Sequence, residues 1–221
     1  MGSDFPGLKR RHERRVTFGR MPVSPIESVT AGVSDMAAAV AFCRDQLRLE
    51  VVSDGRASVG LLGAWKRPVH ETLRLVELAL PGHAPRLRLA EYEMPLTASK
   101  GILGLREFVR PRASVLLAAD DLDAAARFHT QALGWPSIEA GGVELVEGKH
   151  AAAVLAPGHL GFTHLTCACD DLDEVLTRIE ALSLEPLTRP THVGLPGGRP
   201  GRVMLVRAPG NALYELYEIA A

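Results

Sequence analysis

The chain has 221 residues, of which 47% are hydrophobic and 23% are charged, and its formal net charge is −1. This length is enough to bury one large core or two small ones, and the near-neutral charge gives no electrostatic footprint for nucleic acid or an anionic membrane. No apolar run is long enough to span a bilayer. The composition therefore predicts a globular protein without a nucleic-acid or membrane partner.

The N-terminal residues 1–25 carry six basic side chains and no periodic apolar face. No apolar segment of the signal-peptide type follows them, so we interpret this stretch as a basic arm, open to being disordered. The three cysteines, Cys43, Cys167 and Cys169, are too few for a disulfide framework. They predict buried thiols in a reducing compartment and hence a cytoplasmic location.

A pattern of strand, aspartate turn and amphipathic helix occurs three times along the chain. The turns align at three aspartates, Asp35, Asp121 and Asp171. This alignment places three residues at one equivalent position in the preceding strand, namely Ser28, Ser114 and His164. A repeat of this length indicates a fold built from copies of one unit.

The copies divide the chain into modules. Residues 26–96 predict a first βαβββ module, whose last two strands are the alternating runs 71–80 and 85–93, and residues 97–111 predict a linker. Residues 112–158 have room only for a βαββ unit, with short strands at 142–146 and 150–155.

The last module, 159–221, predicts the full βαβββ pattern again. Its first strand alternates, with His164, Thr166 and Ala168 on one face and three apolar residues on the face that the helix covers. After the helix we expect strands at 185–189, 202–208 and 212–218, with a Gly/Pro-rich loop at 191–201.

This order of elements, ending in LYELYE after a Pro-Gly-Asn turn, resembles the vicinal oxygen chelate superfamily, the glyoxalase I, extradiol dioxygenase and bleomycin-resistance group. The resemblance covers residues 26–220. It implies an α+β fold in which repeated βαβββ modules form a curled mixed sheet around a ligand cleft, with the helices on the convex face. It also implies that metal ligands, where present, come from the first and fourth strands of each module.

Carried onto this chain, the resemblance makes His164 the first-strand ligand and Glu215 the fourth-strand ligand of the last module. Ser28 and Ser114 stand where a second histidine is expected, and aligning RLAEYE with LYELYE puts Ala90 at the carboxylate position of the first module. Two ligands therefore remain for one divalent metal, whether zinc, iron, manganese or nickel. A third donor would have to come from elsewhere, the candidates being His129, His192 and Glu91.

Without a metal, a His164–Glu215 pair is itself a candidate general base, because the carboxylate orients the imidazole and raises its basicity. The remaining residues that the resemblance places along the substrate cleft are Ser28, Ser114, Thr166 and Tyr217.

Two functions stay open. The first is an enzyme of the lyase, isomerase or cyclase type that abstracts a proton beside a carbonyl, with or without a metal. The second is a non-catalytic, bleomycin-resistance-like protein that binds a small molecule or drug, for which Trp65 and Trp135 are the candidate aromatic contacts. A metal-dependent dioxygenase is a weaker alternative, since it needs three ligands. The abbreviated middle unit also suggests a homodimer that completes the cleft.

Overall fold

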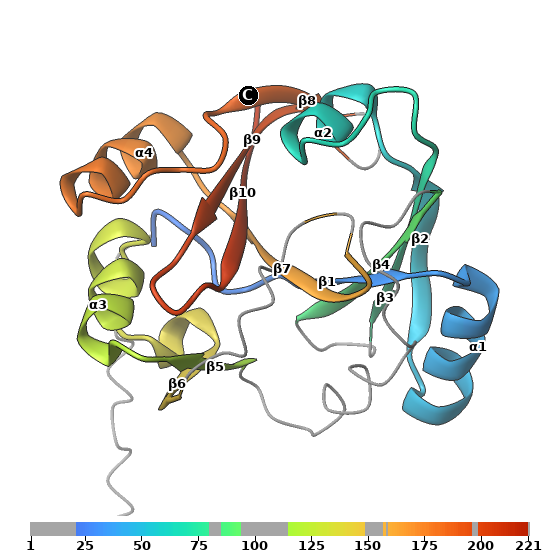
Figure 1. The fold of residues 1–221 in the computed structure, drawn as a ribbon, viewed down its shortest axis with the longest axis horizontal. Coiled ribbons are helices and arrows are strands. Elements are labelled where there is room, and N and C mark those ends of the chain that lie inside the picture. The colour runs from blue at the N-terminus through green and yellow to red at the C-terminus, as the bar shows by residue number, and fades with distance from the viewer. Residues whose placement is uncertain are drawn as a thin grey trace, which may run out of the picture.

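The computed structural model describes residues 21–79, 85–93, 115–148, 157, 159–195 and 199–220. Its main feature is a mixed sheet that curls into a half-barrel (Figure 1). The strands of this sheet, in chain order, are β1 (Ser28–Val33), β2 (Glu50–Arg56), β3 (Leu73–Ala79), β4 (Arg86–Tyr92), β7 (Gly161–Ala168), β8 (Thr191–Gly194), β9 (Pro200–Arg207) and β10 (Leu213–Ile219). They lie in the order β2-β3-β4-β1-β7-β10-β9-β8, and the predicted curled α+β fold is confirmed.

The two halves of the sheet meet where β1 pairs with β7 in antiparallel register. Ser28 lies opposite Thr166, and Thr30 lies opposite His164. The last module therefore closes against the first and not against the middle one. Because a strand turns alternate side chains to opposite faces, this register puts all four residues on the same face of the sheet.

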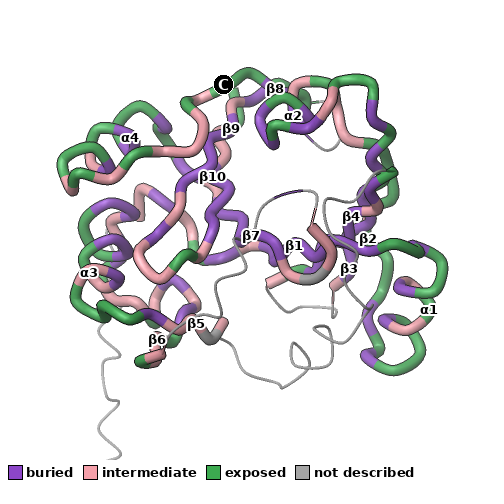
Figure 2. Tube along the Cα trace, viewed as in Figure 1, coloured by how far each residue is buried: buried purple, intermediate pink, exposed green. Residues whose placement is uncertain are grey.

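Two helices cover the outer face, α1 (Met36–Leu47) on the first half and α4 (Leu172–Ala181) on the second. Each begins at one of the aligned aspartates. Asp35 accepts a hydrogen bond from the backbone N–H of Ala38, and Asp171 accepts from those of Asp173 and Glu174. A short carboxylate at this position satisfies N–H groups that have no partner within the helix. In Figure 2 both helices lie at the periphery with exposed outward sides, and the strands β1, β7 and β10 between them are largely buried.

A third helix, α2 (Val59–Ala64), which the sequence did not predict, lies on the inner face. Its Leu61 and Leu62, with the following Trp65, form a buried apolar cluster with inward residues of β3, β4, β8, β9 and β10. The hydroxyl of Ser58, which caps the helix, also donates to the carbonyl of Gly194 in β8, at 2.9 Å. The helix thereby bridges from the first half of the chain to the far edge of the sheet (Figure 1).

The middle unit forms a separate two-stranded parallel sheet of β5 (Val115–Ala119) and β6 (Val143–Glu147). Between them lie α3 (Leu122–Arg127), a π-helical turn at Phe128–Ala132 and a 3-10 turn at Glu139–Gly141. The unit packs through Phe128, Leu133 and Trp135 against α4 and the outer faces of β7 and β10. The expected strand at 150–155 and the linker at 97–111 lie outside the described residues.

The strand expected at 185–189 is wrong: in that stretch only Pro186 forms a bridge, to Val206. The eighth strand is instead Thr191–Gly194, inside the predicted loop. Pro186 and Pro190 lack the N–H that a strand must donate to its neighbour, which explains the shift. At the other terminus the predicted arm is described only from residue 21, and there Val23 is buried and bridges Cys169. Among the described segments, no helix is long and apolar enough to cross a membrane.

Candidate functional site

The centre of the inner face carries a cluster of buried polar side chains. They come from β1, β3, β4, β7 and β10 and are Ser28, Thr30, Glu77, Arg88, His164, Thr166 and Glu215. Buried polar and charged groups are costly unless they are paired. Their gathering on one face, beneath α2, marks this cluster as the candidate site.

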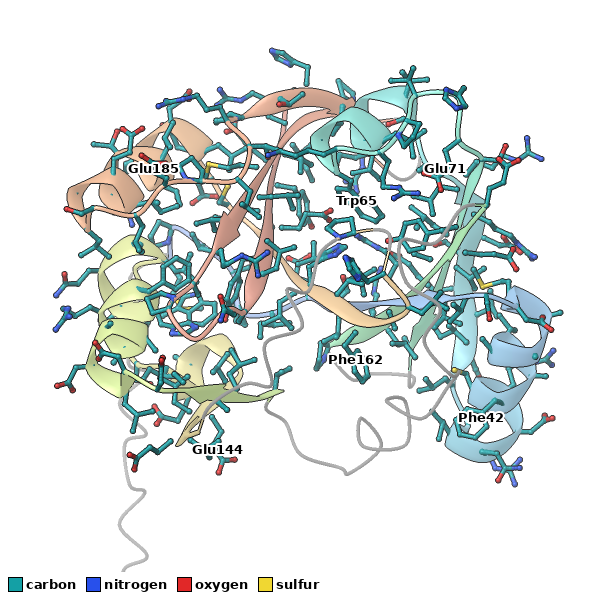
Figure 3. All side chains as sticks on the ribbon, viewed as in Figure 1. Phe42, Trp65, Glu71, Glu144, Phe162 and Glu185 are labelled. Atoms are coloured by element: carbon teal, nitrogen blue, oxygen red, sulfur yellow. The ribbon has the colours of Figure 1, made fainter. Side chains whose placement is uncertain are left out.

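Glu215 accepts hydrogen bonds from three other side chains. Its Oε1 accepts from a guanidinium N–H of Arg88 at 2.9 Å and faces the hydroxyl of Thr166 at 3.4 Å. Its Oε2 accepts from the indole N–H of Trp65, which reaches down from α2 into the molecule (Figure 3). Both carboxylate oxygens are therefore occupied by donors.

His164, whose Nε2 lies 3.5 Å from Oε2, acts together with Arg88 and Trp65 to hold Glu215 in its ionised form. Burial by itself raises the pKa of this carboxyl, but His164, Arg88 and Trp65 together oppose that effect and bring the pKa down to about 2. Hydrogen bonds and a neighbouring cation favour the charged form of an acid. A carboxylate with so low a pKa orients and stabilises its neighbours better than it takes up a proton.

His164 presents one ring nitrogen without a hydrogen-bond partner among the described residues. Its Nδ1 lies 3.0 Å from the hydroxyl of Thr163, which donates to the carbonyl of Thr30 at 3.3 Å. Since that hydroxyl proton is used on Thr30, the chain of bonds is consistent with Nδ1 carrying the ring proton. Nε2 is buried, unpaired and 3.5 Å from Oε2 of Glu215, and the ring meets that of Trp65 edge-on at 4.8 Å.

Arg88 joins the carboxylate of Glu215 to that of Glu77. Its Nε and Nη2 donate to Oε1 of Glu77 at 3.2 and 3.1 Å. Burial lowers the pKa of Arg88, but Glu215 and Glu77 raise it above its ordinary value, so the guanidinium stays charged. Arg86 also contacts Glu77, from the surface, at 3.4 Å. The charges of Arg86 and Arg88 therefore balance those of Glu77 and Glu215.

The position of Arg88 corrects the sequence alignment of the fourth strands. In the register of the sheet, Arg88 pairs with Thr30 in the first module as Glu215 pairs with Thr166 in the last. Arg88, and not Ala90, is thus the counterpart of Glu215. Ala90 lies two residues further along the strand, within the apolar cluster beneath α2.

A second pair of contacts fixes the same correspondence. Glu91 accepts from the backbone N–H of Met36 at the start of α1, at 2.7 Å. Glu218 accepts from that of Leu172 at the start of α4, at 2.9 Å. Glu91 follows Arg88 at the interval at which Glu218 follows Glu215, so the two modules align through these glutamates as well.

The other predicted cleft residues are placed differently. Ser28 is buried, and its hydroxyl has no partner within the described part of the chain. Thr166 faces Glu215, as expected for one face of β7. Tyr217 is half-buried and donates to Glu27 at 2.6 Å, and burial together with that carboxylate raises the pKa of its phenol. Ser114 lies outside the described residues.

None of the three candidate third ligands joins the cluster. His129 lies in the outer core, where its ring nitrogens meet the Ala125 carbonyl and the Tyr214 hydroxyl, both at 2.7 Å. Glu91 caps α1 and His192 is exposed on β8. Across the described residues no group of three His, Cys, Asp or Glu side chains is placed to hold a metal, and the one carboxylate beside His164 already binds a guanidinium. These donors do not fit a divalent ion.

The sequence did not predict four residues of the site, namely Thr30, Glu77, Arg88 and Trp65. Glu77 in β3 (LRLVELA) and Arg88 in β4 (RLRLAEY) are charged residues at inward positions of strands whose other residues are largely apolar. Since a buried charge demands a partner, that pattern was a usable signal. Trp65 was noted only as an aromatic, while Trp135 lies in the outer core and donates to backbone carbonyls.

A curled sheet of two βαβββ units, with first- and fourth-strand residues meeting on its inner face, defines the vicinal oxygen chelate fold. Similar solved structures bear this out. Glyoxalase I from Zea mays has a TM-score of 0.55 at 10% identity, over 89% of this chain and 92% of that chain. A point mutant of it gives 0.57 at 12% identity, over 89% and 93%.

Methylmalonyl-CoA epimerase from Mycobacterium tuberculosis covers 94% of this chain and 95% of its own at 18% identity, with a TM-score of 0.49. At the level of sequence, no family profile and no curated protein matches the chain. The similarity to the two glyoxalase I structures confirms the predicted resemblance for the fold.

Proposed function

We propose that the protein is a small-molecule enzyme that moves a proton at a carbon beside a carbonyl group, with His164 as the base. The observation that carries the proposal is Nε2 of His164, which is buried on the inner face without a hydrogen-bond partner in the described part of the chain and lies 3.5 Å from the carboxylate of Glu215. Isomerases and lyases of this kind need one group that takes a proton and a fixed charge that stabilises it afterwards.

The proposed step uses the contacts already described. The substrate C–H bond breaks, its proton moves to Nε2 of His164, and the electron pair passes to the carbonyl oxygen as an enolate. The imidazolium so formed lies beside the Glu215 carboxylate, which Arg88 keeps ionised. Returning the proton from Nε2 to the neighbouring carbon completes an isomerisation, whereas returning it to the same face of the same carbon regenerates the substrate and appears only as hydrogen exchange with the solvent. Glu215 is a positioning residue here, because its low pKa makes it a poor base.

A non-catalytic binding protein is the second candidate, and one observation favours it. Both oxygens of Glu215 already accept hydrogen bonds within the protein, and the inner face above it is filled by the apolar side chains of α2, Leu61 and Leu62 among them. An apolar ligand could replace that contact without any proton transfer. The weaker alternative, a metal-dependent dioxygenase, is disfavoured, because the described residues around His164 do not provide three ligands.

The test is hydrogen exchange in D₂O, which registers proton removal whatever product the enzyme forms. Carbonyl and thioester compounds with an acidic α-hydrogen are incubated with the protein, and loss of the α-proton signal is followed by ¹H NMR. We expect exchange that is lost in His164→Ala and kept in His192→Ala, a histidine exposed on β8. Compounds that bind without exchanging would support the binding protein, and exchange that survives His164→Ala would refute the assigned base.

A cytoplasmic location and a homodimer belong to the same proposal. The cysteines described are free and buried, in line with a reducing compartment. A monomeric mass by light scattering would contradict the dimer.

A further inference from the structure

We propose that the guanidinium of Arg88 takes the place of the divalent cation that the resemblance implies for this fold, so that the site carries its own positive charge and works without a metal. The inference deepens the proposed function and rests on it for the choice of site. It concerns which cation the site uses.

The first support is position. Two independent correspondences, the strand register and the helix-capping glutamates, make Arg88 the counterpart of Glu215. The first module thus offers a cation where the last module offers an anion. Instead of two carboxylates converging on an ion, the two fourth strands contribute a complementary pair that meets directly, at 2.9 Å.

The second support is occupancy. A metal would have to bind Glu215 through an oxygen that already accepts from Arg88 or Trp65, with a second cation packed against it. Arg88 cannot lose its proton to relieve that repulsion, because guanidinium stays charged at all working pH values. It cannot readily swing away either, because Nε and Nη2 are anchored on Glu77. The site is therefore closed to a divalent ion by charge as well as by ligand count.

The third support is the unpaired groups. The hydroxyl of Ser28, at the first-strand position of β1, and Nε2 of His164, on the neighbouring β7, are both buried without a hydrogen-bond partner in the segments that the structure describes. They lie on the same inner face as the Arg88–Glu215 pair. A ligand oxygen placed there would find a hydroxyl donor in Ser28 and a fixed positive charge in Arg88, the two features that stabilise a developing enolate.

The inference is tested by metal binding on the full chain, with no substrate. Wild-type protein is equilibrated with zinc, nickel, manganese or iron(II), desalted and measured by elemental analysis. We expect no stoichiometric metal. Arg88→Glu supplies a second carboxylate facing Glu215 and His164, and should gain about one equivalent of zinc, because three protein ligands suffice for such a site. Arg88→Leu removes the charge without adding an oxygen, nitrogen or sulfur donor and should gain none.

Two further variants keep the result decisive. Adding His164→Ala to Arg88→Glu should abolish the gained zinc, which separates the site from surface histidines such as His192. If Arg88→Glu does not fold, Arg88→His offers a neutral ligand at the same position, and the wild-type measurement stands by itself. Stoichiometric metal in the wild type that is lost in His164→Ala would overturn the inference, and so would an Arg88→Glu or Arg88→His variant that folds and gains no zinc. Failure of the D₂O exchange would refute the proposed function and leave these metal measurements as they are.

Discussion

Replacing Arg88 by methionine should cost more stability than any surface substitution in this chain, because it strands two buried carboxylates. Arg88 makes three hydrogen bonds to Glu77 and Glu215, at 2.9 to 3.2 Å, and its side chain is 9% exposed. Methionine fills a similar volume but offers no donor. The variant therefore isolates the charge of Arg88 from its packing.

The magnitude follows from two routes. Breaking a buried ion pair by removing one partner costs about 3–5 kcal/mol. The second route is the pKa of Glu215, which is about 2 in the folded protein against an ordinary 4.5. At about 1.4 kcal/mol per pH unit this difference corresponds to about 3 kcal/mol, which His164, Arg88 and Trp65 share, so Arg88 supplies a part of it. Because the folded pKa is depressed, this stabilisation is complete above pH 4.5 and is lost as the pH falls toward 2.

Urea unfolding at pH 7 measures the loss, and Arg86→Met is the matched control. Arg86 contacts the same Glu77 at 3.4 Å, but its side chain is 52% exposed, so its removal should cost about 1 kcal/mol or less. The double variant Arg88→Met with Glu215→Gln should recover part of the stability, since one stranded charge is gone. Equal losses for Arg86→Met and Arg88→Met would refute the assignment of Arg88 as the buried cation.

Two further perturbations test the outer core and the contact of α2 with β8. Burial lowers the pKa of His129 from 6.5 to about 4, so unfolding free energy should fall by up to about 3 kcal/mol between those pH values as the unfolded chain takes up a proton. His129→Gln should reduce the change of the unfolding free energy with pH, and an unchanged pH dependence would contradict the assignment to His129. At Gly60 a Cβ would meet the carbonyl oxygen of His192 at 2.8 Å and Cα of Val193 at 3.0 Å, so Gly60→Val should cost about 1–3 kcal/mol in thermal unfolding. Gly63→Ala in the same helix meets nothing within 4 Å and should be neutral or stabilising, and equal effects would argue against the close packing of α2 on β8.

The repeat predicted the outline of the fold because its features depend on interactions between residues that are close in the sequence. Aspartates at the helix starts, period-two strands and apolar helix faces each have a short-range cause. Asp35, Asp121 and Asp171 all cap helices in the structure. The residues that a strand's period turned to the inner face, His164 and Thr166, do lie there.

The sequence alignment of the fourth strands was wrong because LYELYE and RLAEYE both end in Tyr-Glu. Aligning these two ends shifts one strand by two residues relative to the other. Matching the final glutamates put Ala90 opposite Glu215, whereas the structure equates Glu91 with Glu218 through the helix starts that they cap. A two-residue error keeps every side chain on its face, so alternation could not expose it. Only a contact across strands, such as a capping bond, fixes the register.

The position of α2 could not be predicted from the residues around it in the sequence, for a different reason. Its six residues, VGLLGA, are too few for a periodic signal, and its N-cap hydroxyl bonds to Gly194, far away in the sequence. That Trp65 donates to Glu215 follows from this long-range docking. Side chains that meet only after the sheet has curled leave no pattern along the chain.

The closure by α2 sets a condition on either proposed function. The side chain of His164 is 0% exposed, so a ligand reaches Nε2 only after α2 and Trp65 have moved. Opening requires the loss of the Ser58–Gly194 bond and of the Trp65–Glu215 bond, and a ligand binds with reduced apparent affinity in proportion to how seldom that state occurs. Gly60→Val, which pushes α2 away from β8, should therefore strengthen ligand binding while it weakens the fold, an opposition that a purely structural helix would not produce.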